Sequence, residues 1–157
     1  MYWWNIKELK ATLASGTLSE HARFLYLLIY SVVGALVSEF PLIAENPNIW
    51  DRASSATVIL ATISGTTLAY RMNGGKNGHH FLERYLAIGW VFLLRFAAFV
   101  IPIMVVAYIF ASTIGLVGEF STEFDAVLIF VFMVFYYFGL CKHIQGVAAI
   151  ERGAVPN

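Results

Sequence analysis

Four long runs of apolar residues constrain this chain more than any other feature of its sequence. They cover residues 24–44, 54–70, 90–117 and 126–142, and each is long enough for a helix to cross a bilayer core, which takes about 17–25 residues. Only 13% of the 157 residues are charged, whereas a soluble domain carries about 25%. The chain has too few polar side chains to cover a water-facing surface, so we expect lipid around most of it.

The positions of the basic residues predict how these runs cross the membrane. Arg and Lys are retained on the cytoplasmic side of membrane proteins. If all four runs cross, only Arg52 falls on one side. The basic residues on the other side are Lys7, Lys10, Arg23, Arg71, Lys76, Arg84, Lys142 and Arg152. We therefore predict a protein of the bacterial inner (plasma) membrane, with both termini and the loop 71–84 in the cytoplasm.

These patterns predict an all-α fold, a four-transmembrane-helix bundle that forms a single integral membrane domain over residues 1–157. Residues 85–118 are too few for two crossings of about 20 residues each with a turn between them. The third run is therefore expected to be one helix, in which Pro102 removes one backbone hydrogen bond.

Residues 1–16 are expected to form a short amphipathic helix ahead of the first span. Ile6, Leu9 and Leu13 recur at helical spacing on one face, and two tryptophans precede them at positions that suit the headgroup level. We expect an interfacial helix whose apolar face lies in the membrane surface. The alternative is that this face packs under the cytoplasmic ends of the chain's own spans.

The most polar stretch, residues 70–85 ("YRMNGGKNGHHFLERY"), lies between the second and third runs. Its glycines lack the G-x-x-x-x-G-K-S/T pattern of a phosphate-binding loop. Its two Asn-Gly pairs are typical of turns that contain a positive φ. We therefore predict a reverse turn, and we expect the basic side chains of Arg71, Lys76 and Arg84 to contact anionic lipid headgroups.

Two histidines in this stretch raise the question of a metal site. His79 and His80 are adjacent, so on a helix their side chains point about 100° apart. The topology brings Cys141 and His143, at the end of the fourth run, to the same face of the membrane. These four residues are candidate zinc ligands only if they converge, and nothing in their spacing requires it. We therefore expect no metal and no cofactor.

Two ionisable residues, Glu39 and Arg95, lie within the apolar runs. Such residues are costly in lipid and are functional candidates. Glu39 is about 22 Å along the first span, which places it near the outer surface. Arg95 has two interpretations: an anchor that extends to the inner headgroups, or a deeper cation that faces a wet cavity. The anchor requires the N-terminal helix or a neighbouring subunit to cover the apolar residues 85–94.

The second span has two neighbouring faces that do not suit lipid alone. One is made of small residues at every fourth position, Gly65 among them, which favours close packing against another helix. The other carries the hydroxyls of Ser55, Thr62 and Thr66. These hydroxyls are candidates to line a pore, since polar residues in spans turn toward protein or water. The alternative is that each bonds to the carbonyl of the preceding turn.

The function is predicted from this setting, since no motif names an activity. A net charge of zero gives no electrostatic reason to expect nucleic acid as a partner. We expect a homo-oligomeric channel or small transporter whose pathway lies between subunits around a symmetry axis. The alternative is a non-catalytic accessory, assembly or scaffold subunit that binds another membrane protein. No acid, base and nucleophile converge recognisably, so we do not expect an enzyme.

The predicted topology is tested by the accessibility of single cysteines in a Cys141→Ser background. Intact cells carrying Arg52→Cys, Lys76→Cys or Arg152→Cys are treated with a membrane-impermeant maleimide. We expect only Arg52→Cys to react, because the other two positions lie on the basic side that is retained in the cytoplasm. Labelling of Lys76→Cys and Arg152→Cys from opposite sides would overturn the topology.

Overall fold

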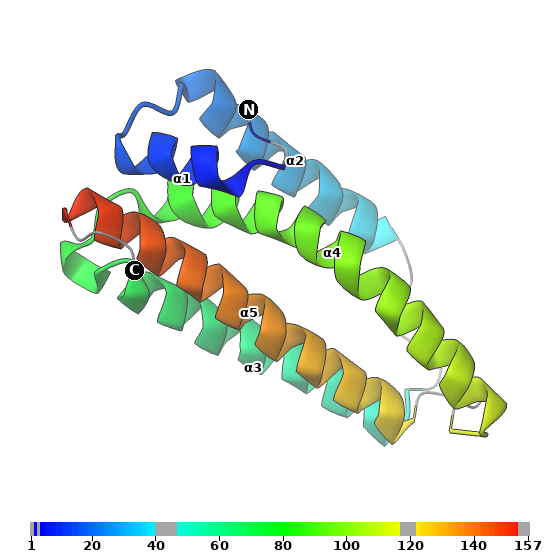
Figure 1. The fold of residues 1–157 in the computed structure, drawn as a ribbon. Helices are drawn as coiled ribbons and strands as arrows, with labels where there is room; N and C mark the ends of the chain where they lie inside the picture. Colours follow the sequence, from blue (N-terminus) through cyan, green and yellow to red (C-terminus); the bar gives the residue numbers. More distant parts are fainter. Residues whose placement is uncertain (1, 3, 40–46, 117–121, 154–157) are drawn as a thin grey trace.

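The structure is a computed structural model that describes residues 2, 4–39, 47–116 and 122–153 (Figure 1). Every regular element in these ranges is helical, which confirms the predicted all-α class. The elements are α1 (Ile6–Ala14), α2 (Glu20–Glu39), α3 (Ile49–Met72), the 3₁₀ helix η1 (Gly75–Asn77), α4 (Phe81–Thr113) and α5 (Glu123–Glu151). The third apolar run forms one helix, as expected, because α4 continues through Pro102.

Two of these helices, α4 and α5, are long and apolar enough to cross a membrane, among the residues that the structure describes. The structure does not confirm all four expected spans. In α3, the charged pair Asp51 and Arg52 and several hydroxyl residues lower the mean hydropathy. For α2, residues 40–44 of the predicted run lie outside the described part of the chain. The structure therefore supports a membrane location through α4 and α5.

The sequence predicted a bundle of four spans, and the four long helices pack against one another in a row. Within the described ranges, α3 packs along α5, α5 contacts α4, and α4 contacts α2 (Figure 1). Two consecutive residues of α5 explain its central place. The Tyr136 ring lies 5.7 Å from the Phe92 ring of α4, whereas Tyr137 lies against Gly65 of α3. Successive side chains of a helix point about 100° apart, so α5 meets a different neighbour on each side.

The buried core lies at one end of this row, where α1, the turn at η1 and the carboxyl end of α5 meet (Figure 1). Its centre is made of apolar residues with no exposed surface. They are Leu9, Ala69, Ala87, Ile88, Val91, Leu140, Ile144 and Val147. The opposite halves of α4 and α5 bury far less of their apolar surface within the chain.

Large apolar side chains are exposed along those opposite halves. Phe99 and Ile103 of α4 are 69% and 68% exposed, and Phe135 of α5 is 61% exposed. Exposed apolar patches of this extent mark a surface that another apolar phase covers. Their position on the two helices that are long enough to cross a membrane supports lipid as that phase.

The sequence predicted that the apolar face of the N-terminal helix lies in the membrane surface, and this prediction is wrong. Ile6, Leu9 and Leu13 of α1 are buried, and α1 packs on α4 and α5. This is the alternative that the sequence left open. The physical reason is that the apolar start of α4 needs cover: Ile88 and Val91 belong to the same buried cluster as Leu9. α1 ends at Ala14, and Gly16, two residues further on, has a φ of +67° that suits glycine.

The contact between α3 and α5 depends on the absence of a side chain at Gly65. A Cβ atom built at this position would lie 2.2 Å from Cδ1 of Tyr137, well inside van der Waals contact. Ala69, one turn further along, is also fully buried. The predicted small-residue face of this helix is therefore confirmed at these two positions as a packing surface within the chain.

We predict that Gly65→Ala destabilises the protein by about 1–3 kcal/mol, the usual cost of overpacking a core. Gly34→Ala is the matched control, since Gly34 lies in α2 and no atom lies within 4 Å of a Cβ built there. Unfolding of both variants is followed in detergent by circular dichroism. Equal stability of the two variants would show that the α3–α5 contact is not as close as described.

Candidate functional site: polar groups at the basic end of the helices

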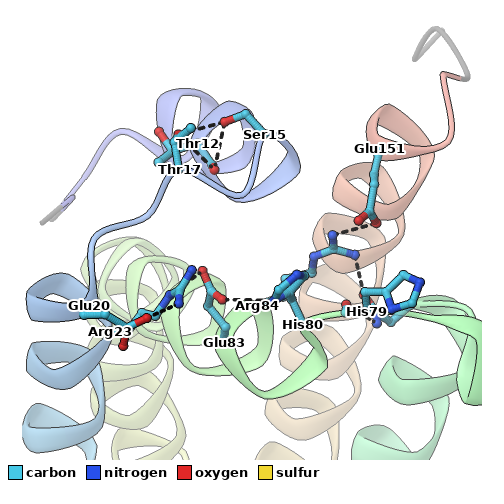
Figure 2. Close-up of polar contacts among 11 residues, drawn as sticks. Thr12, Ser15, Thr17, Glu20, Arg23, His79, His80, Glu83, Arg84 and Glu151 are labelled. Carbon is cyan, nitrogen blue, oxygen red and sulfur yellow. Dashed lines mark hydrogen bonds and ion pairs between the residues drawn. The ribbon is translucent and has the colours of Figure 1, made fainter.

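Arg84 is a charged residue with no exposed surface. It lies in the first turn of α4, and its guanidinium joins three parts of the chain (Figure 2). Nη1 donates to Oδ1 of Asn73 at 2.9 Å, and Nη2 donates to Oε2 of Glu151 at 2.7 Å. Asn73 is itself buried and donates through Nδ2 to the carbonyl of His79 at 3.1 Å. The end of α3, the turn, the start of α4 and the end of α5 are thus held by one cation.

The Glu151 carboxylate is the acidic partner of this arrangement, and its side chain is 32% exposed. The hydrogen bond from Arg84 is the main cause that lowers the pKa of the Glu151 carboxyl below its ordinary value of 4.5. The positive charge of the same guanidinium acts in the same direction. Glu151 therefore stays ionised at neutral pH and compensates the buried charge of Arg84.

A second ionic cluster joins α2 to α4 on the other side of this end (Figure 2). Nε of Arg23 lies 3.2 Å from Oε1 of Glu83, and Arg23 also pairs with Glu20 within its own helix. His80 precedes α4 and places Nδ1 3.5 Å from Oε2 of Glu83. The same four residues border an apolar groove of about 550 Å³ between α2 and α4.

Tyrosine hydroxyls gather where the four long helices approach one another. Oη of Tyr85 in α4 is 3.0 Å from Oγ1 of Thr66 in α3. The side chains of Tyr30 in α2 and Tyr136 in α5 are hydrogen bonded to each other. A Cβ atom at Gly89 would lie 2.5 Å from the Tyr30 oxygen, so the close approach needs glycine. These contacts satisfy hydroxyls that would otherwise be costly in an apolar core.

The two predicted intramembrane charges have different positions. Arg95 lies on α4, and its guanidinium carbon is 5.4 Å from the centre of the Trp4 ring, which precedes α1. The N-terminal segment therefore covers this part of α4, as the anchor interpretation requires. Glu39 is the last residue of α2, and its side chain lies outside the described part of the chain.

The three residues predicted to contact lipid headgroups are not equivalent. Arg71, near the end of α3, and Lys76, in η1, are exposed. Arg84 is buried and bonded within the chain, so its guanidinium does not face a headgroup. The prediction for Arg84 is corrected for this reason. A basic residue near the end of a span can contact headgroups only if its side chain is not already paired with a carboxylate of the same chain.

The four candidate metal ligands have separate neighbours. The Cys141 thiol is buried and donates to the Gly65 carbonyl at 3.8 Å, whereas the His143 ring packs 5.2 Å from the Phe92 ring. His80 pairs with Glu83, and the backbone carbonyl of His79 accepts a bond from Asn73. Within the described ranges, no three His, Cys, Asp or Glu side chains are arranged to hold a metal ion.

The hydroxyl candidates on α3 divide into two groups. Thr66 is used inside the chain through Tyr85. Ser55 and Thr62 are exposed. Their exposed neighbours Ser64 and Thr67 instead bond back to the carbonyls of the preceding turn, at 2.6 and 2.7 Å. Ser55 and Thr62 are seven residues apart, which places them on one face of the helix two turns apart.

Asn73 and Glu151, the two partners of Arg84, were not predicted from the sequence. Glu151 is 67 positions away from Arg84, so no local spacing connects them. The Asn73-Gly74 pair did indicate a turn. Asn-Gly pairs are typical of turns in general, however, and do not predict that the Asn side chain bonds to an arginine. The tyrosine cluster was missed for a similar reason, since its members lie on different helices.

Comparison of the chain with protein-family models, with curated proteins and with solved structures found no match. The function is therefore argued from the geometry alone.

We predict that Glu151→Gln destabilises the protein by about 1–3 kcal/mol, because it leaves the buried Arg84 cation without its counter-charge. The exposed Glu8 gives the control, and Glu8→Gln is expected to change stability by less than about 0.5 kcal/mol. Adding Arg84→Met to Glu151→Gln should recover part of the loss, since the double variant has no buried charge. Additive losses in the double variant would contradict this account.

The ion pair also predicts a pH dependence of unfolding. The folded-state pKa of Glu151 is lowered, so its contribution is complete above the ordinary value of 4.5 and is lost as the pH falls through the lower, folded-state pKa. The difference in unfolding free energy between wild type and Glu151→Gln should therefore shrink as the pH is reduced from 7 through this window. A difference that stays constant over the whole titration would contradict the pairing.

Proposed function

We propose that the chain is a four-span integral membrane protein with its basic end in the cytoplasm. The charges of the described residues support this placement. The end that contains α1, η1 and the carboxyl end of α5 carries most of the basic residues. The opposite end carries Asp51 and Asp125, which cap α3 and α5. This asymmetry follows the distribution expected of a protein oriented by its cytoplasmic Lys and Arg.

The proposed activity is passage of an ion or small solute through a homo-oligomer, with the pathway between subunits. The observation that carries the proposal is the outward face of α3. Its small-residue face is occupied by α5, whereas Ser55 and Thr62 lie on the neighbouring face and are exposed. Within the described part of the chain neither hydroxyl has a hydrogen-bond partner, in contrast to Ser64 and Thr67. Two such hydroxyls at membrane depth favour a water-lined surface between subunits.

A pathway inside one chain has less support. The space between α4 and α5 contains aromatic rings in contact, such as Phe96 with Phe132 at 5.0 Å. The space between α3 and α5 is closed by Tyr137 against Gly65. A polar passage through a single subunit would require these rings to move apart, which makes the subunit interface the better location.

An accessory or scaffold subunit is the second candidate, and one observation favours it. The halves of α4 and α5 that lie away from the buried core border a groove of about 310 Å³. It is lined by apolar residues, including Ile103, Met104 and Val131. Small interhelical spaces of this kind suit packing against a helix of another membrane protein. This candidate predicts a protein that forms a complex and passes nothing by itself.

The two candidates are separated by flux through liposomes that contain the purified protein. We predict flux above that of empty liposomes, and we predict that Thr62→Val lowers it about fivefold, the factor for a lost hydrogen bond of about 1 kcal/mol. Ser55→Ala is expected to act in the same direction.

Thr67→Val is the matched control. Thr67 is exposed on the same helix, but its hydroxyl is already bonded to Ile63, so its removal should leave the flux unchanged. No flux under several ion gradients and voltages would reject the channel and favour the accessory subunit. Equal effects of Thr62→Val and Thr67→Val would reject the proposed lining face.

A further inference from the structure

Three cationic side chains and one uncharged histidine lie between α1, α4 and α5, apart from both ionic clusters described above. The members of this group are Lys10 of α1, Arg95 of α4, and Lys142 and His143 of α5. The positive charges of Lys10, Arg95 and Lys142 all act on the His143 ring, which places the four groups in one region of the molecule. They come from three helices that are far apart in sequence and are brought together because α1 packs on both α4 and α5.

This group has no acidic member among the described residues. The ion pairs of this end of the molecule involve Arg23, His80 and Arg84, and none involves Lys10, Arg95 or Lys142. The strongest charge that acts on Lys10 is that of another cation, Lys142. Burial, followed by this repulsion, lowers the pKa of Lys10. Neighbouring like charges in a partly buried position are costly unless an anion compensates them.

Two buried nitrogen atoms of this group also lack a hydrogen-bond partner in the described part of the chain. They are Nε of Arg95 and Nδ1 of His143. A buried polar nitrogen without a partner costs about 1–3 kcal/mol, so two of them in one place indicate a ligand that accepts hydrogen bonds. The aromatic face of Trp4 holds the Arg95 guanidinium from the other side.

The backbone near these groups leaves room for Lys10 to reach α5. Gly146 lies one turn beyond Lys142, and a Cβ atom at Gly146 would lie 3.2 Å from Nζ of Lys10. The Lys10 ammonium therefore lies against α5 one turn from Lys142, and it forms no ion pair with a carboxylate of the described residues. An anion placed among these groups would receive charge-assisted hydrogen bonds from several helices at once.

We propose that Lys10, Arg95, Lys142 and His143 form a binding site for a phosphate-bearing anion. The placement at the cytoplasmic end of the spans fits the headgroup of an anionic lipid, because basic pockets between membrane helices bind such headgroups. A free phosphate group offers the same chemistry from solution. The site is independent of whether the protein passes a solute, since none of its residues belongs to the proposed lining face of α3.

The test is a binding measurement on the full-length protein in neutral detergent. Phosphatidylglycerol is titrated and bound lipid is counted by native mass spectrometry, with phosphatidylcholine as the neutral comparison; inorganic phosphate is titrated in a second arm. We expect one saturable anion site, and we expect Lys10→Gln and Lys142→Gln each to weaken it about tenfold, the scale of one charge-assisted hydrogen bond. Arg95→Lys should bind more tightly than Arg95→Gln, because it keeps the charge.

Lys7→Gln is the matched control, because it removes one positive charge from an exposed position of α1, the same helix that carries Lys10. It should leave the affinity unchanged. Circular dichroism confirms that each variant is folded before binding is measured. Saturable binding of phosphatidylglycerol alone identifies a lipid headgroup, and competition by inorganic phosphate identifies a free phosphate group; either supports the site. Absence of saturable binding in both arms, or equal weakening by Lys7→Gln and Lys142→Gln, would overturn it.

Discussion

The buried guanidinium of Arg84 is the constraint on which the arrangement of this end of the molecule depends. A charge with no exposed surface is tolerated only when its hydrogen bonds and its counter-charge are supplied by the protein. Asn73 and Glu151 accept hydrogen bonds from its two terminal nitrogens, at the end of α3 and the end of α5, and Glu151 supplies the counter-charge. Any displacement of α5 along α4 would separate Glu151 from Arg84. The pair therefore sets the register of the helices as well as their proximity.

Away from this end, α4 and α5 carry apolar side chains that the described part of the chain leaves exposed. The core is concentrated around Leu9, Ile88 and Ile144, and the opposite halves of α4 and α5 expose their large apolar side chains. In water, the exposure of so many large apolar side chains would be unfavourable. In a bilayer, lipid would cover such a surface at little cost. Buried ion pairs and hydrogen bonds such as those of Arg84 would then be needed only at the ends of the helices, outside the hydrocarbon.

The cations of the basic end differ in what compensates them. Arg84 and Arg23 are paired with carboxylates of the chain and hold helices together. Lys10, Arg95 and Lys142 approach one another without such a partner among the described residues, which is the basis for the anion site proposed above. On α3 a similar division separates Thr66, which bonds to Tyr85, from the exposed Ser55 and Thr62. In both cases the proposal rests on a polar group without a partner in the described part of the chain. The proposed partner is an anion for Lys10, Arg95 and Lys142, and the water of the pathway for Ser55 and Thr62.

The amino-acid sequence by itself determined the helical class, the continuity of the third apolar run as one helix and the turn at residues 73–78, because apolar run length, Asn-Gly pairs and glycine positions are local signals. It also identified Gly65 as a packing residue, since small side chains at every fourth position need no knowledge of the partner helix. Only the tertiary structure decided that α1 packs on protein, that the helices form a row, and that Arg84 is enclosed while Arg71 stays exposed. These outcomes depend on which side chains from distant segments meet, and the free energy of a buried charge is set by those neighbours rather than by its place in the sequence.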